Sequence, residues 1–330
     1  VTDIQIELAS WNRLLTRDLA ISPEIVGFGH KFDFEGRIVI VKLPGANKLP
    51  TEPNKGELLT FNGWREVDGK KMPLYYWVHS VDITVSLPSP VTVPRQILNQ
   101  PPNAYEIVSE GKQEELDRFA KDNEPFTRKA FDLWLRILRW KSNHGSIGRP
   151  EVHGHESGWG TCLVTQSSGQ RIWIWHDAFR GRCAVPITSE IWQAAEFALV
   201  NQQIPPVYIE LMFDAIEHIE LADYQRALVD MAVACETYLR KIVADSIPAG
   251  MSDRITEYID DANIRNVLTK FVPDLINEEQ QKNLKSISST LHQLFDKRND
   301  ILHSGRIEPP TKTECDRYLE TTKTLLNLRG

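Results

Sequence analysis

Long apolar runs are absent from the chain, and their absence limits the kind of protein it can be. No stretch approaches the ~18 consecutive apolar residues that a transmembrane helix requires, so we expect no membrane among its partners. The first residues alternate apolar and polar side chains and do not form the apolar core of a signal peptide. With 41% hydrophobic and 25% charged residues in a total of 330, the composition is typical of a soluble globular protein with room for two domains.

Cysteine is scarce, because the chain has four and no two of them stand close together. Closely spaced pairs would predict a zinc site or a disulfide framework, whereas scattered cysteines fit a reducing cytosol better. An excess of positive charge is also lacking, since the net charge is −7. This argues against broad non-specific binding to duplex nucleic acid and leaves room for a small local basic site. We therefore expect a cytoplasmic protein without a cofactor.

Residues 3 to about 97 are rich in short alternating, aromatic or β-branched runs, which predict strands. These runs lie at residues 4–8, 30–34, 37–41, 74–78 and 81–85. Proline, glycine and asparagine interrupt them often, so we expect a small β-sandwich or a curled sheet. His30 and His79 are single histidines within the strand patterns, and we predict that they are packing or surface residues rather than ligands.

A linker is predicted at residues 100–103, Gln-Pro-Pro-Asn, with a sub-boundary near residues 98–104. Two helical patterns follow it. The first is short and charged and covers residues 112–121. The second is stronger and begins at Glu124, so that Pro125 stands early in a helix, where proline is tolerated.

Strands return after these helices, because residues 161–165 and 171–175 predict a hairpin. Residues 1–200 are therefore predicted to form a β-rich α+β domain that senses or targets, with a regulatory protein or a ligand as its partner. The loop before the hairpin contains His153 and His155, and a His-x-His pair can supply two metal ligands. Its spacing matches no strong zinc signature, so a flexible polar loop is the alternative and no metal site is predicted.

Residues 205–330 are predicted to form an all-α bundle, because the apolar spacing is helical from Ser189 onwards, with a break at residues 200–206. Helices are expected over residues 207–220, 223–245, 278–303 and 313–328, with a shorter helix or helix pair over 252–268. The helix predicted over residues 223–245 is the most regular of these. Its apolar stripe comprises Ala227, Met231, Ala234, Cys235, Tyr238, Leu239 and Ile242. Glu236 lies one residue off this stripe, at the edge of the buried face.

The end of the helix predicted over residues 278–303 reads Arg298-Asn299-Asp300-Ile301-Leu302-His303 and is followed by a serine and a glycine, which form a helix stop. At ~100° per residue, Arg298 and His303 are about 140° apart, while Asn299 and His303 share a face. The long arginine can swing towards that face. A guanidinium beside an imidazole can bind a phosphate and move a proton next to it, although this spacing also arises by chance in helices.

Two stretches of the predicted bundle resemble the HEPN superfamily, in particular its Apea-like branch. Residues 223–240 look like the family's alanine-rich helix, with an acidic residue followed by a bulky pair, and residues 298–303 match its Arg-polar-x3-His signature. The resemblance covers residues 205–330. It implies a helical HEPN-like fold and a metal-independent endoribonuclease, acting as a toxin, a phage-defence effector or an RNA-processing enzyme. It also implies a homodimer, with the active site formed by the Arg-x4-His segments of both copies.

Four residues suit the RNA cleavage that the resemblance implies. His303 would be the general base or acid, because histidine titrates near neutral pH. Arg298 would bind the phosphate and stabilise its charge, while Asn299 would orient His303 or bind the substrate. Glu236 would hold Arg298 in place or form a structural salt bridge only. Other superfamily members bind nucleotides, RNA or proteins without cleavage, and such a non-catalytic protein is the alternative.

The predicted boundary can be tested with a fragment of about residues 200–330. It should fold as a helical bundle by circular dichroism, because the break at residues 200–206 precedes a complete set of amphipathic helices. A fragment that is unfolded while the whole chain is folded would show that the boundary is wrong.

Overall fold

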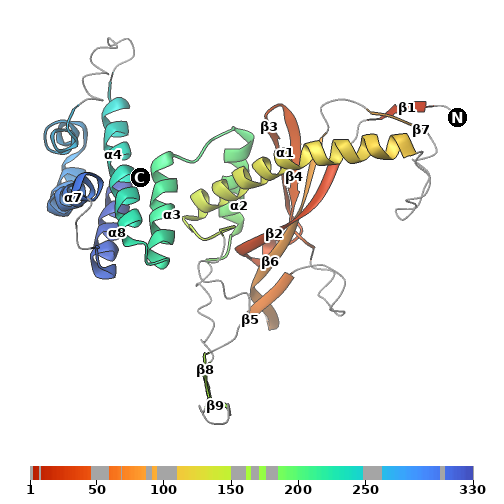
Figure 1. Ribbon diagram of the computed structural model, residues 1–330, viewed down its shortest axis with the longest axis horizontal. Coiled ribbons are helices and arrows are strands. Elements are labelled where there is room, and N and C mark those ends of the chain that lie inside the picture. Colours follow the sequence, from red (N-terminus) through yellow and green to blue (C-terminus); the bar gives the residue numbers. More distant parts are fainter. Residues whose placement is uncertain are drawn as a thin grey trace. The chain divides into compact units, whose positions relative to one another are not determined.

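The computed structural model describes residues 3–6, 9–45, 59–67, 69–86, 91–94, 110–149, 161–164, 171–175, 185–247, 262–304 and 309–329. A β-rich region comes first and helices follow, so the chain has the predicted α+β class with a helical C-terminal part (Figure 1). The described chain divides between Ile204 and Pro205 into an N-terminal and a C-terminal unit. Within the described ranges, no helix has both the length and the apolar character needed to cross a membrane.

Five antiparallel strands form the main sheet of the N-terminal unit: β2 (Ala9–Ile21), β3 (Gly29–Phe34), β4 (Arg37–Lys42), β5 (Leu59–Val67) and β6 (Lys70–Ser86). The long β6 pairs with β2, β4 and β5, and β3 pairs with β4. Two further pairs form sheets of their own: β1 (Asp3–Ile6) with β7 (Val91–Pro94), and β8 (Thr161–Val164) with β9 (Arg171–Trp175), which is the predicted hairpin.

Strand β6 is continuous where two strands were predicted, at residues 74–78 and 81–85. The irregularity lies in the partner strand instead. The register of β2 shifts opposite His79, which stands between the two predicted runs. There Asp18 has a φ of 51°, and the Thr16 hydroxyl donates to a carbonyl of β6. A side chain thus donates to the backbone of β6 where the register of the ladder shifts, and β6 passes through unbroken.

Helix α1 (Glu110–Ser142) is a single helix where two were predicted, and Pro125 lies inside it. A proline within a helix removes one backbone hydrogen bond, and the local sequence does not distinguish it from a first-turn proline. Beyond Pro125, α1 packs with α2 (Ser189–Val200) and the main sheet in one core. Large members of this core are Leu19, Val39, Ile83, Trp134, Leu138 and Trp192. Among the described residues, helices rather than a second sheet therefore cover the main sheet. The predicted linker at residues 98–104 lies outside the described residues.

His30 on β3 is a packing residue, as predicted, and it is fully buried. Its Nδ1 accepts a hydrogen bond from Trp134 Nε1 at 3.0 Å, and its Nε2 lies 3.2 Å from the Trp192 carbonyl oxygen. The ring stacks on that of Trp192 with the centroids 3.7 Å apart. A neutral imidazole with its proton on Nε2 satisfies both contacts. The other histidine predicted to pack or to lie at the surface, His79, is exposed.

The C-terminal unit contains α3 (Val207–Glu220), α4 (Tyr224–Ala244), α6 (Ile264–Asn266), α7 (Glu278–Ser304) and α8 (Lys312–Leu326). A π-helical turn (Val267–Phe271) and a 3-10 turn (Val272–Leu275) follow α6. The four regular helices confirm their predicted ranges to within about two residues. Residues 252–261 of the predicted shorter helix lie outside the described residues. The predicted apolar stripe of α4 is buried throughout, and it packs with Leu291, Leu294 and Phe295 of α7 and with Cys315, Tyr318 and Leu325 of α8.

Burial lowers the pKa of His30 from 6.5 to about 4. An imidazole in the unfolded chain takes up a proton near pH ~6.5, so between these two values only the unfolded state binds that proton. His30 therefore contributes stability that is complete above the unfolded pKa and is lost as the pH falls towards the folded one. The loss amounts to about 3 kcal/mol at most.

Unfolding of the N-terminal unit can be followed by tryptophan fluorescence, because Trp192 is the last of the nine tryptophans. We expect the urea midpoint to fall from pH 7 to pH 5 in the native chain and to fall less in His30→Gln. Glutamine cannot titrate, yet it can accept from Trp134 and donate to the Trp192 carbonyl. His292→Gln, on α7, should keep the native pH dependence. Equal slopes for the native chain and His30→Gln would contradict the prediction.

Candidate functional site

Two packed helices, α4 and α7, position the candidate site. Their buried apolar residues fix how each helix is rotated about its axis. In α4, Cys235 and Leu239 are fully buried, so Glu236, which is next to Cys235, emerges at the edge of the buried face. In α7, Phe295 is buried, and Arg298 follows it by three residues and lies on the same side. The apolar patterns of the two helices thereby bring Glu236 and Arg298 together.

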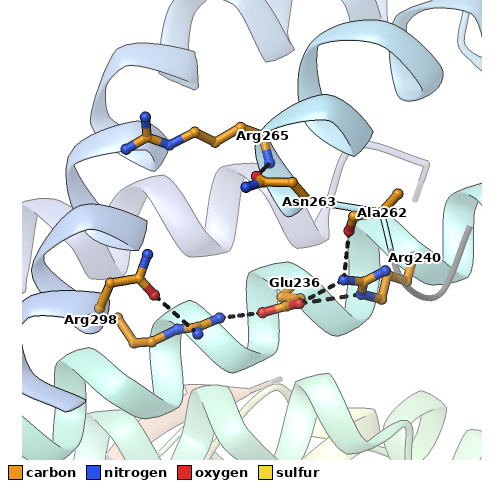
Figure 2. A network of polar contacts seen from close by, with 7 residues as sticks. Glu236, Arg240, Ala262, Asn263, Arg265 and Arg298 are labelled. Carbon is orange, nitrogen blue, oxygen red and sulfur yellow. Dashed lines mark hydrogen bonds and ion pairs between the residues drawn. The ribbon is translucent and has the colours of Figure 1, made fainter. Parts of the chain in front are cut away.

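The carboxylate of Glu236 is shared by two arginines (Figure 2). Its Oε2 accepts from Arg298 Nη2, and its Oε1 accepts from Arg240 Nε at 3.2 Å and Nη2 at 2.9 Å. The side chains are between 19% and 25% exposed, and partial shielding from water strengthens such ion pairs relative to fully exposed ones. The carboxylate thus joins a guanidinium of its own helix to one of α7.

Arg240 also fixes the segment that leads into α6. Its Nη2 donates to the Ala262 carbonyl at 3.1 Å, and Asn263 Oδ1 caps α6 by accepting from the backbone N–H of Arg265 at 2.9 Å (Figure 2). Arg265 in turn forms an ion pair with Asp296 on α7. Polar contacts therefore run from α4 through α6 to α7 and return to α4 at the shared carboxylate.

Three of the four predicted site residues are in contact: Arg298, Asn299 and Glu236. Asn299 Oδ1 accepts from Arg298 Nη1 at 3.2 Å, so its amide binds the arginine and does not orient His303, which is one of the roles that the sequence suggests. His303 is exposed in the last turn of α7 and forms no hydrogen bond or ion pair with another described residue. It lies about 7.5 Å further along the helix than Arg298 and about 140° around it. One chain therefore does not bring Arg298 and His303 together.

Arg298 retains unused capacity as a hydrogen-bond donor. A guanidinium has five N–H groups, and Arg298 directs one to Glu236 and one to Asn299. Its Nε is buried and has no hydrogen-bond partner within the described part of the chain. Nη1 and Nη2 each have a second N–H, and these are the donors that remain for a further acceptor beside Arg298. A phosphate oxyanion is the chemical class that matches an arginine best.

Lys297, the residue before Arg298, ties α7 to α8. It pairs with Glu314, which belongs to the capping box at the start of α8. The hydrogen bond from Lys297, together with the one from the Thr311 backbone, lowers the pKa of Glu314 to about 2. The backbone that carries Arg298 is therefore held on two sides, by α8 through Lys297 and by α4 through its own guanidinium.

Sequence reasoning missed Arg240, although a signal for it was present. Glu236 and Arg240 stand four residues apart in a predicted helix, which is the spacing of a stabilising pair of opposite charges. The metal ligands considered above, His153 and His155, lie outside the described residues. Within the described ranges, no three His, Cys, Asp or Glu side chains are grouped in a way that could hold a metal ion.

No protein-family model, curated protein or solved structure matches the chain.

Glu236→Gln should destabilise the C-terminal unit, because two partly buried guanidinium groups would then face a neutral amide. The loss should be about 1–3 kcal/mol, between the values for exposed and buried ion pairs. Far-UV circular dichroism in urea follows both units, whereas tryptophan fluorescence follows the N-terminal unit alone. We expect the circular-dichroism curve to shift to lower urea concentration and the fluorescence curve to stay unchanged. Glu279→Gln, in the exposed first turn of α7, is the matched control, and an equal shift in it would contradict the prediction.

Proposed function

We propose that the C-terminal unit is a metal-independent endoribonuclease of the HEPN type that cleaves single-stranded RNA in the cytoplasm, as a toxin or phage-defence effector. The observation that supports this most is the state of Arg298. Glu236 and Asn299 hold its guanidinium, which keeps unused donors and stands five residues before an exposed histidine on the same helix. The N-terminal unit, which has a core of its own, would regulate or target the nuclease.

The proposed reaction uses the 2′-hydroxyl that lies beside each phosphodiester of RNA. His303 removes the hydroxyl proton as a general base, and the 2′ oxygen attacks the phosphorus. The bond from phosphorus to the 5′ oxygen breaks, and that oxygen takes up a proton. The products are a cyclic phosphate and a 5′-hydroxyl. Arg298 binds the non-bridging oxygens and stabilises the charge that develops on them.

A second copy of the chain is part of this proposal. His303 does not meet Arg298 within one chain, and Leu302 beside it is 56% exposed. In the proposed two-fold contact, residues 298–303 of two copies face each other and the exposed Leu302 is covered. His303 of one copy would then serve a phosphate that is held by Arg298 of the other.

The alternative is a protein that binds a nucleotide, an RNA or another protein without cleaving anything. The separation of Arg298 from His303 within one chain favours it, because an arginine cluster is sufficient to bind a phosphate. The two functions differ in whether His303 is needed for more than binding.

His303→Ala in the full-length chain should lower the cleavage of a labelled single-stranded RNA by ~10²- to 10⁴-fold, the usual effect of losing a general acid or base. The fold should persist, because His303 is exposed near a helix end. Arg298→Ala should also lose activity, and Arg298→Lys should not restore it fully, since lysine lacks the bidentate fork. His292→Ala, on the same helix, is the matched control and should cleave like the native chain.

Two further conditions make this test sharper. Cleavage should persist in EDTA, because no proposed step requires a metal. A mixture of His303→Ala and Arg298→Ala should recover part of the activity, since a mixed dimer has one intact Arg298 and one intact His303 on opposite copies. Equal cleavage by the native chain and His303→Ala would refute the site assignment, and loss of cleavage in EDTA would refute the metal-free mechanism. Binding without cleavage in every condition would favour the alternative.

A further inference from the structure

We infer that Arg240 is a positioning residue of the candidate site, which acts through Glu236 to keep the donors of Arg298 available for an RNA phosphate. This deepens the proposed function and rests on it, because the ligand of Arg298 is taken to be a phosphodiester. Arg240 lies outside the segment 298–303 on which the function was argued, and it belongs to a different helix.

The two oxygens of Glu236 are divided between the two arginines. Two N–H groups of Arg240 point at Oε1, at 3.2 Å and 2.9 Å, so Arg298 meets the carboxylate through Oε2 only. An arginine and a carboxylate otherwise tend to form a fork of two parallel hydrogen bonds. If Arg240 were absent, both oxygens would be able to turn towards Arg298, and the fork would occupy a second of its N–H groups. Arg240 therefore limits how much of Arg298 is taken up by Glu236.

Arg240 can do this because it is itself held in place. Its spacing of four residues from Glu236 puts both side chains on one face of α4. The Ala262 carbonyl, on the segment before α6, accepts from Arg240 Nη2 at 3.1 Å. A guanidinium fixed at a carbonyl and a carboxylate together keeps that carboxylate in one orientation. Loss of Arg240 would therefore weaken the binding of a phosphodiester at Arg298, because Glu236 would be released to occupy a second of its N–H groups.

Arg240→Ala in the full-length chain should raise the KM for a labelled single-stranded RNA about tenfold and lower kcat by less than about threefold. An arginine with a merely structural role would lower the fraction of folded enzyme, and hence kcat, without raising KM. Arg240→Lys should recover most of the KM, because lysine keeps the charge and can reach Glu236. An unchanged KM in Arg240→Ala would overturn the inference.

Lys241→Ala is the matched control for this experiment. It removes the same charge from the adjacent position of α4, where the lysine pairs with Asp245 four residues on, away from Glu236. We expect its KM to equal that of the native chain. A rise as large as that in Arg240→Ala would mean that the total charge of the chain matters rather than the position of Arg240, and would overturn the inference.

A 2′-deoxy oligonucleotide of the same sequence lacks the attacking hydroxyl and gives a measurement that does not depend on cleavage. In fluorescence anisotropy, Arg240→Ala should weaken its binding about tenfold in the native background and not at all in the Arg298→Ala background. Equal losses in both backgrounds would show that Arg240 contacts the nucleic acid itself and would overturn the inference. If the native chain binds the probe but cuts no RNA, the proposed function fails and the same binding cycle still decides the role of Arg240. A native chain that neither binds nor cuts overturns both.

Discussion

The polar contacts between helices of the C-terminal unit depend on the carboxylate of Glu236, which pairs with Arg240 and Arg298. A single arginine beside it would close an ordinary ion pair, and a pair of this kind near the surface contributes little. Because one arginine comes from the same helix and one from α7, the carboxylate binds both and links the two helices. Its position follows from apolar packing, since the buried stripe of α4 places Glu236 at its edge.

The two units handle buried polar groups in different ways. In the N-terminal unit, His30 is fully buried and neutral, and Trp134 and the Trp192 carbonyl satisfy both of its nitrogens. A core tolerates a buried polar group only when hydrogen bonds satisfy its polar atoms. In the C-terminal unit, Arg298 is charged, partly exposed and left with a buried Nε that has no partner in the described chain. The proposed binding of an anion by Arg298 needs donors that no other side chain uses, and a position at the edge of a core allows them.

Periodicity was sufficient to predict α4 and α7, because long apolar stripes leave little choice of secondary structure. It placed Glu236 at the edge of the buried face of its helix. The contact between Glu236 and Arg298 was expected from the family resemblance and not from periodicity, since it depends on how two helices rotate when they pack. The pairing of Arg240 with Glu236 could have been predicted from the sequence, because the two residues stand four apart in a predicted helix. The continuity of β6 could not have been predicted, because the register shift that accompanies it lies near Asp18, in a strand remote in sequence.

Within one chain, His303 does not come together with Arg298. Contacts to α8 and α4 hold α7 at Lys297 and Arg298, and beyond them Leu302 and His303 are exposed. While Arg298 stays on Glu236, the last turn of α7 would have to unwind for His303 to approach it. Proton transfer requires the base within hydrogen-bond reach of the atom it serves, so a base and an anion-binding group that act on one phosphate must meet between two chains. If the proposed function holds, catalysis at this site depends on self-association, and cleavage by a strict monomer would require the end of α7 to rearrange.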